Sequence, residues 1–375
     1  MNDESLRAAL ALWRVSGIGP ERWRRLVEHC GSAQAALRAP AADLRRCQLT
    51  ATQIDALRTP DWRGADADLH WSQGADCAII DAAHPAYPEM LRALPDAPPL
   101  LFARGDLDLL RFPALAVVGS RNPTHGGVDN AQHFAAALAA RGLAIISGLA
   151  LGIDAAAHQG ALQAQGATIA VMATGPDRIY PQANRPLAKH IAQQGLLITE
   201  FPTGVLPHRA FFPRRNRLIS GLALGVLVVE AAPRSGSLIT ARQARDQGRE
   251  VFAIPGSIHN PLSRGCHQLI QQGAKLVASA DDIYQEIGPQ LSGDSPPPAP
   301  PPAAAGGLAA PAELPAAHRQ LLTAMGYDPI GIDALVQRLG LTPEAISSML
   351  LILELEGHVA ISPGGTYTRI SGETT

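Results

Sequence analysis

Residues 114–287 alternate between short apolar runs and helical stretches, and this alternation constrains the fold more than any other feature of the chain. The runs that we expect to be strands are Leu115–Val118, Ala144–Ile146, Thr168–Met172, Leu196–Thr199, Val226–Val229, Glu250–Ala253 and Lys275–Val277. Short apolar strands separated by helices favour a parallel sheet covered by helices on both faces. The sequence therefore predicts an α/β fold with a doubly wound parallel sheet, in which ligands bind beyond the carboxyl ends of the strands.

An arginine-rich stretch follows the fourth of these strands. It reads Phe211-Phe212-Pro213-Arg214-Arg215-Asn216-Arg217, and Arg209 lies just ahead of it. Guanidinium groups suit phosphates, and an aromatic face suits an unstacked base. A solvated loop whose phenylalanines fill the core explains the same residues, and the stretch alone does not decide between the two interpretations.

Two other segments have the chemistry of anion sites. One is a small-residue turn after the first strand, Gly119-Ser120-Arg121, whose backbone N–H groups suit a phosphodiester. The other is a helix start, Ser235-Gly236-Ser237. A tight turn and ordinary helix capping explain the two segments equally well. Neither has the glycine spacing of a dinucleotide fingerprint or the Gly-Lys-Ser/Thr of a P-loop, so we expect no cofactor.

Candidate catalytic groups are few. Asp154 and His158 lie four residues apart on an expected helix, where they share a face, but no third metal ligand has a suggestive spacing. Buried hydrogen bonding is the favoured interpretation of this pair. Glu200 and Glu230 stand at strand ends as acid–base candidates, although each would equally anchor a neighbouring arginine. Without a recognisable hydrolase or metal motif, we expect neither a metal site nor an enzyme.

The overall charge limits the kinds of partner. The formal net charge is −2, so any nucleic-acid site must be a local patch. The four cysteines have neither disulfide-framework nor zinc-ligand spacing. The chain begins with polar and acidic residues rather than a signal peptide, and its apolar runs are too short to span a bilayer. We expect a cytoplasmic protein with no membrane partner.

Shifts in composition divide the chain into five expected parts. Residues 1–65 form helices around Gly17-Ile18-Gly19-Pro20, which is either a phosphate-holding helix-hairpin-helix turn or a plain tight turn. Residues 66–113 are a proline-rich connector on the core with an edge strand at Leu100–Ala103, and residues 114–287 are the sheet domain. Residues 288–313 are a proline/alanine linker, and residues 314–375 have the helix–turn–helix and hairpin pattern of a winged helix.

The second helix of this winged-helix pattern is acidic. It carries Glu344, Glu354 and Glu356 and no basic residue. A winged helix that reads DNA normally has lysine or arginine there. We therefore expect a protein-interaction module, or at best a very weak duplex binder.

The motifs of the chain, taken in order, resemble one family. They are Gly119-Ser-Arg, Ser147-Gly-Leu-Ala-Leu-Gly-Ile-Asp154, Tyr180-Pro-Gln-Ala-Asn184, Phe212-Pro-Arg-Arg-Asn-Arg-Leu-Ile-Ser-Gly221, Ser235-Gly-Ser-Leu-Ile-Thr-Ala241 and Gly265-Cys-His-Gln-Leu-Ile270. This set closely resembles the DNA-processing protein A family (DprA, also called Smf). The N-terminal helices look like the family's sterile-alpha-motif-like domain, and the C-terminal part looks like its winged helix.

The resemblance implies an extended Rossmann fold, single-stranded DNA binding, a homodimer, and loading of the RecA recombinase during natural transformation. The family's DNA pocket maps to Arg121, Ser147, Arg209, Phe212, Arg215 and Asn216, and Gly148 follows Ser147 at the same strand end. Gln182 stands at a position that is often basic in relatives. The family's dimer contact maps to His267, Ile270 and Leu276.

Two other functional readings compete with this one. The fold also resembles that of nucleotide phosphoribohydrolases of the LOG or lysine-decarboxylase-like type, which carry Pro-Gly-Gly-x-Gly-Thr-x-x-Glu. Here Thr240 stands where that glutamate would be, which argues against N-glycosidic cleavage. The third reading is a pure adaptor, in which the linker and the winged helix are the active parts.

Overall fold

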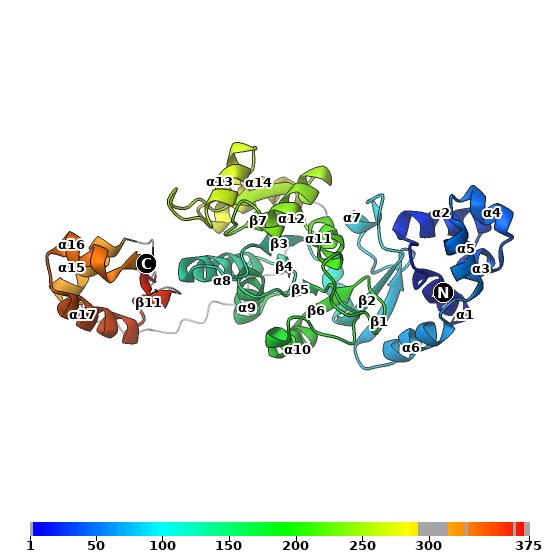
Figure 1. Ribbon diagram of the computed structural model, residues 1–375, viewed down its shortest axis with the longest axis horizontal. Coiled ribbons are helices and arrows are strands. Elements are labelled where there is room, and N and C mark those ends of the chain that lie inside the picture. Colours follow the sequence, from blue (N-terminus) through cyan, green and yellow to red (C-terminus); the bar gives the residue numbers. More distant parts are fainter. Residues whose placement is uncertain (1–2, 292–313, 327–328, 363–364, 371–375) are drawn as a thin grey trace.

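The computed structural model describes residues 3–291, 314–326, 329–362 and 365–370 (Figure 1). Its centre is a nine-stranded sheet in the order β1-β2-β6-β5-β4-β3-β7-β8-β9. The strands are β1 (Cys77–Asp81), β2 (Leu100–Gly105), β3 (Ala114–Val118), β4 (Ala144–Ser147), β5 (Thr168–Val171), β6 (Leu196–Thr199), β7 (Gly225–Val228), β8 (Glu250–Ala253) and β9 (Lys275–Leu276). The strands from β3 to β9 pair in parallel, whereas β2 is antiparallel to both of its neighbours.

Every strand expected between residues 114 and 287 is present, with ends shifted by at most one residue. The expectation of an edge strand at Leu100–Ala103 was wrong, because β1 pairs with the outer side of β2 and Cys77 lies opposite Arg104. β1 itself has one buried residue, Ile80, among half-buried ones. Such a strand has no continuous apolar run, which is why the sequence pattern did not reveal it.

Helices cover both faces of the sheet, as the doubly wound pattern predicted. Along β3, Leu115 and Val117 face one core, while Ala116 and Val118 face the other. The first face is covered by α8 (His125–Ala139), α9 (Ile153–Gln163), α10 (Arg185–Gln194) and α14 (Ala280–Leu291). The second face is covered by α7 (Glu89–Arg92), α11 (Phe211–Gly221), α12 (Gly236–Asp246) and α13 (Arg264–Gln271). Short 3-10 helices lie at η1 (Leu107–Arg111) and η2 (Gln182–Asn184).

The N-terminal helices pack onto the β2 side of the sheet (Figure 1). They are α1 (Asp3–Trp13), α2 (Pro20–Cys30), α3 (Ala33–Arg38), α4 (Ala41–Arg46), α5 (Ala51–Arg58) and α6 (Trp62–Ser72), so α6 crosses the boundary expected at residue 65. Leu100 and Phe102 of β2 belong to their core, and Trp13 Nε1 donates to Glu200 O at 2.7 Å. The helical unit is thereby fixed to the end of β6.

The C-terminal part has the winged-helix arrangement that the sequence predicted. It contains α15 (Ala316–Met325), α16 (Ile332–Leu339) and α17 (Pro343–Leu355), with a small sheet of β10 (Ile330–Gly331), β12 (Thr366–Arg369) and β11 (Val359–Ser362). Thr342 caps α17 as expected, because its Oγ1 accepts from Ala345 N. A hydrogen bond between His125 Nε2, at the start of α8, and Ile361 O (2.8 Å) joins this unit to the sheet domain.

The boundary between the sheet domain and the linker was expected at residue 287. The structure continues α14 to Leu291, and the rest of the expected linker lies outside the described residues. Within the residues that are described, no helix combines the length and the apolar character that a membrane span requires.

Candidate nucleic-acid interface

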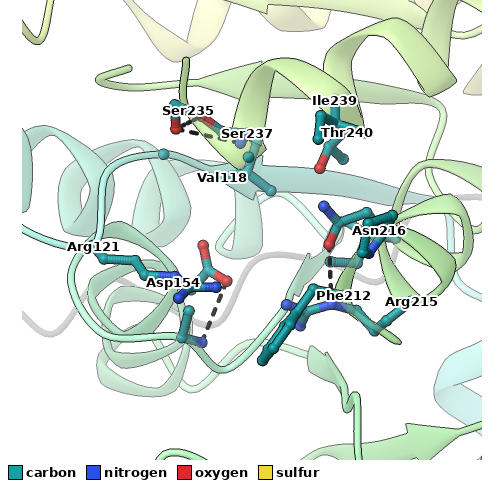
Figure 2. Close-up of a pocket in the computed structure, with 15 residues that line it drawn as sticks. Val118, Arg121, Asp154, Phe212, Arg215, Asn216, Ser235, Ser237, Ile239 and Thr240 are labelled. Carbon is teal, nitrogen blue, oxygen red and sulfur yellow. Dashed lines mark hydrogen bonds between the residues drawn. The ribbon is translucent and has the colours of Figure 1, made fainter. Parts of the chain in front are cut away.

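A cleft of about 430 Å³ opens beyond the carboxyl end of β3, and we name it the strand-end cleft (Figure 2). Its walls come from the turn after β3, the start of α9, and the first turns of α11 and α12. Most of the predicted DNA-binding residues line it: Gly119, Arg121, Phe212, Arg215, Asn216, Ser235, Gly236 and Ser237. The topology thus brings together segments that are more than 100 residues apart in the sequence.

The remaining predicted residues do not line this cleft. Ser147 is fully buried and its Oγ donates to Val117 O at 2.6 Å, so the hydroxyl satisfies the sheet rather than a ligand. Ser120 Oγ accepts from Asn122 N within the turn. Gly148 lines a smaller adjoining cavity of about 70 Å³, and Arg209 is exposed in the loop before α11.

An arginine and two aromatic rings meet at the boundary of the two cavities. The Arg121 guanidinium lies over the Phe212 ring, 5.2 Å from its centroid. The centroid of the Tyr180 ring lies 6.0 Å from that of Phe212, and Tyr180 is 46% exposed. The sequence did not predict a role for Tyr180, although this residue begins the family motif Tyr180-Pro-Gln-Ala-Asn184. Gln182 lines neither cavity.

The two adjacent phenylalanines have different roles. Phe211 stacks on Phe201, with ring centroids 4.5 Å apart, and so belongs to the packing beside β6. Phe212 lines both cavities. The core-filling interpretation therefore holds for Phe211, and base binding at Phe212 stays a prediction.

Arg215 is buried, at 4% exposure, although the family resemblance maps it to the DNA pocket. Its Nη1 donates to Val171 O at 2.7 Å and to Gly148 O, and its Nε donates to Asn216 Oδ1 at 3.1 Å. Burial lowers the pKa of Arg215 to about 10, while nearby Asp154 acts in the opposite direction, so the group stays charged at neutral pH. Most of its donors hold the protein together and are not free for a ligand.

The other arginines of α11 also face the protein. Arg217 is 7% exposed, and its Nη2 lies 2.6 Å from Glu200 Oε2. Arg214 Nη2 lies 3.3 Å from the same oxygen, and its guanidinium stacks over Phe201. Glu200, which the sequence left open as an acid–base candidate or an arginine anchor, is an arginine anchor.

The start of α12 supplies the opposite wall of the strand-end cleft. Ser235 caps the helix, because its Oγ accepts from Ser237 N at 3.3 Å. No atom of the described residues lies within 4 Å of where a Cβ on Gly236 would stand, so the backbone here is open to an approaching group. A helix N-terminus with free space above it attracts anions through its backbone amides and its dipole.

Asp154 and His158 do not form a dyad. Asp154 Oδ2 accepts from Gly148 N at 3.1 Å and from Ala150 N at 3.3 Å, which fixes the turn after β4. Burial raises the pKa of Asp154, against the lowering effect of Arg215 and of these two hydrogen bonds. His158 Nδ1 bonds Thr168 Oγ1 at 2.7 Å, and burial lowers the pKa of His158 to about 3. Buried hydrogen bonding, the favoured interpretation, is confirmed.

Glu230 has a structural role too. Its carboxylate accepts from Thr124 N at 2.9 Å and from Thr124 Oγ1 at 2.6 Å, at the residue that caps α8. Among the described residues, no group of three histidine, cysteine or acidic side chains could hold a metal ion.

The residues predicted at a dimer contact lie at the far end of the sheet. His267 and Ile270 are half-buried on α13, and Leu276 is 49% exposed on β9. His267 Nε2 lies 2.9 Å from Gly256 O. β9 is the last strand of the sheet, so its outer edge is unpaired by any described strand.

Comparison with protein families gives three matches along the chain. Residues 78–288 match the model described as DNA recombination-mediator protein A. Residues 3–50 match the DprA-like N-terminal HHH domain, and residues 295–365 match the DprA winged helix domain. The chain belongs to the DprA family.

Curated relatives agree with this assignment. The chain is 41% identical to Protein Smf of Escherichia coli over 333 residues, which are 88% of this chain and 87% of the relative. It is 52% identical to the DNA processing protein DprA of Streptococcus pneumoniae over 274 residues, which are 73% of this chain and 95% of the relative.

Two solved structures are similar to the family fold seen here. The X-ray structure of DprA from Streptococcus pneumoniae matches with a TM-score of 0.67 at 39% identity, over 75% of this chain and 97% of that one. A structure of DNA processing protein A from Helicobacter pylori, described for its single-stranded DNA binding mode, matches with a TM-score of 0.52 at 30% identity. It covers 57% of this chain and 96% of that one.

Proposed function

We propose that the strand-end cleft binds single-stranded DNA and that the protein is a recombination mediator, which captures a strand without cleaving it. The observation that carries this proposal is the Arg121 guanidinium lying 5.2 Å over the Phe212 ring in an open cleft. A cationic fork beside an aromatic face suits a phosphate next to an unstacked base. Membership of the family and the single-stranded DNA binding of the Helicobacter pylori relative support it.

Capture would use few side chains. A base that stacks on Phe212 replaces the Arg121 guanidinium there, which frees that guanidinium for the adjoining phosphate. Tyr180 offers a second ring to the next base, and the open start of α12 at Gly236 faces a phosphate. Stacking contributes roughly 1–3 kcal/mol per base and tolerates any sequence.

The other predicted residues would support this surface. Arg215 ties Gly148 to the end of β5 through two carbonyls, and Asn216 orients Arg215 through its side-chain oxygen. Both are then positioning residues. Arg209 would add attraction for the strand from the rim of the cleft.

A homodimer and delivery of the strand to RecA complete the proposal. We place the dimer contact at His267, Ile270 and Leu276, because β9 ends the sheet and carries an exposed apolar side chain. An unpaired strand edge is a natural site for pairing with another chain. The family's description as a recombination mediator supports RecA delivery. A native mass of one 39.4 kDa chain would reject the dimer.

The sheet domain, residues 114–287, would hold the whole strand-binding function. Deleting residues 292–375 removes the winged helix and is expected to leave the affinity for single strands unchanged. A loss of tenfold or more, about 1.4 kcal/mol, would move the binding function to the C-terminal part and favour the adaptor reading.

A nucleotide phosphoribohydrolase remains the competing function. Of the described residues that line the strand-end cleft, Asp154 is the only acid, and two backbone amides occupy one of its oxygens. We infer that it is not a catalytic acid. Incubation with AMP or a cytokinin nucleotide is expected to release no ribose phosphate, and measurable release would favour the enzyme.

The test of the proposed function is the affinity for single- and double-stranded oligonucleotides of one sequence, measured by fluorescence anisotropy across salt concentration. The proposal predicts tighter binding of the single strand, with a salt slope of about 0.7 for each phosphate held. Equal affinity for the two forms would reject it.

A further inference from the structure

A second cleft, of about 160 Å³, lies at the other end of α12. It is formed by the last turns of α12 and α13 and the start of β8, and it contains three arginines: Arg242, Arg245 and Arg249. We name it the arginine cleft. None of these residues was selected from the sequence, and none lines the strand-end cleft.

The charges of the arginine cleft are not balanced within the protein. Arg242 and Arg245 are exposed, and neither forms an ion pair or a hydrogen bond with the described residues. Glu250 is the one described acid that lines the cleft. Arg245 stands in the last turn of α12, where the helix dipole favours a cation, but this accounts for one arginine and not for three.

Arg249 is only partly satisfied by the protein. Its Nη2 donates to Met90 O at 3.2 Å, but its Nε is buried and has no partner among the described residues. Burial without a compensating carboxylate lowers the pKa of Arg249. A buried donor without an acceptor is destabilising unless a ligand supplies one.

We propose that the arginine cleft is a second phosphate-binding site for the same DNA strand that the strand-end cleft holds. The two clefts share α12, whose first turn lines one and whose last turn lines the other. Ser237 lines one cleft and Arg245 the other, and these residues lie about 12 Å apart along the axis of α12, a span that a few nucleotides cross. Ile239 and Arg242 are both exposed along α12 and mark the path between the clefts.

This inference rests on the proposed function and predicts a dependence on strand length. A dinucleotide occupies the strand-end cleft alone, whereas a strand of about twenty nucleotides reaches both sites. The double variant Arg242→Gln/Arg245→Gln is expected to bind the long strand about tenfold more weakly and the short strand as well as the unchanged protein does. Its salt slope on the long strand should fall by about 0.7 for each phosphate lost.

The matched control is Arg45→Gln/Arg46→Gln, which removes two exposed arginines from the N-terminal helices. It changes the net charge by the same amount, so equal weakening by the control would assign the effect to overall charge and overturn the site. Unchanged long-strand affinity in Arg242→Gln/Arg245→Gln would also overturn it. If that variant instead loses only the binding of a polyglutamate peptide, the cleft serves an acidic protein. If the unchanged protein binds no single strand, the proposed function itself fails.

Discussion

Arg217 and Arg121 carry the same group in opposite surroundings. Arg217 is 7% exposed and meets Glu200, together with the backbone and side chain of Asp96. Arg121 is exposed and forms no ion pair with a described residue, and its guanidinium rests on an aromatic ring. A buried guanidinium must have its donors satisfied by the protein, whereas an exposed one keeps them for a ligand. The comparison separates arginines that build this protein from those that serve its function.

The largest effect should follow from breaking the buried pair. Arg217→Met leaves the Glu200 carboxylate buried beside its more distant partner Arg214, which typically costs about 3–5 kcal/mol of unfolding free energy. Denaturant unfolding measures this loss. The double variant Glu200→Gln/Arg217→Met should recover most of it, because the charges left without a partner, Arg214 and Asp96, are partly exposed to solvent. If Arg217→Met is as stable as the unchanged protein, the buried arginines do not build the fold.

Replacing the exposed group should affect binding and spare stability. Arg121→Ala and Phe212→Ala are each expected to weaken single-strand binding about tenfold, or about 1.4 kcal/mol, without moving the unfolding midpoint. Anisotropy titration and thermal unfolding measure the two quantities. The comparison is contradicted if both variants bind single strands with normal affinity. It is also contradicted if the weaker binding is accompanied by a lower unfolding midpoint.

The titration of His158 tests the buried residues of the comparison, because the burial of His158 makes the stability of the protein depend on pH. Burial, and secondly the charge of Arg215, hold its folded pKa at about 3, below the unfolded value of about 6.5. The unfolded chain therefore takes up the proton first, so stability is full above about pH 6.5 and falls as the pH drops from there toward about 3. Between about pH 7 and pH 6 the loss should stay under about 1 kcal/mol. His158→Gln should flatten this part of the stability curve, and an identical curve in the variant would show that His158 titrates normally.

Arg209 should give the smallest effect. It is exposed but does not line the strand-end cleft, so it contributes only long-range attraction from the rim. Arg209→Ala is expected to weaken single-strand binding about twofold, mostly at low salt. A loss as large as that of Arg121→Ala would place Arg209 in direct contact with the strand.

The sequence predicted the sheet well because buried parallel strands are marked by continuous apolar runs. It also placed Arg121 and Phe212 at one edge, since both follow strand ends. It did not predict the burial of Arg215, because this residue stands in a run of four polar residues, Arg214-Arg215-Asn216-Arg217, and no local pattern marks which of them turns inward. The acceptors of that guanidinium are the carbonyls of Gly148 and Val171, 67 and 44 residues away, and no local pattern reports contacts of that range.

The sequence did not predict the arginine cleft for a related reason. Arg242, Arg245 and Arg249 are spaced like the solvated face of any helix, and only the packing of α12 against the end of α13 encloses them. The role of Tyr180 also depends on a tertiary contact, because the loop before η2 brings its ring to Phe212. The motifs located the functional edge, and tertiary contacts decided which side chains face it.

The most direct test of the central claim is photo-crosslinking of a single-stranded oligonucleotide that carries a photoreactive base, followed by mass mapping of the attached peptides. The strand-end cleft predicts crosslinks in the peptides that contain Phe212 and Tyr180, and their loss in Phe212→Ala. Crosslinks confined to the N-terminal helices or to the winged helix would contradict it.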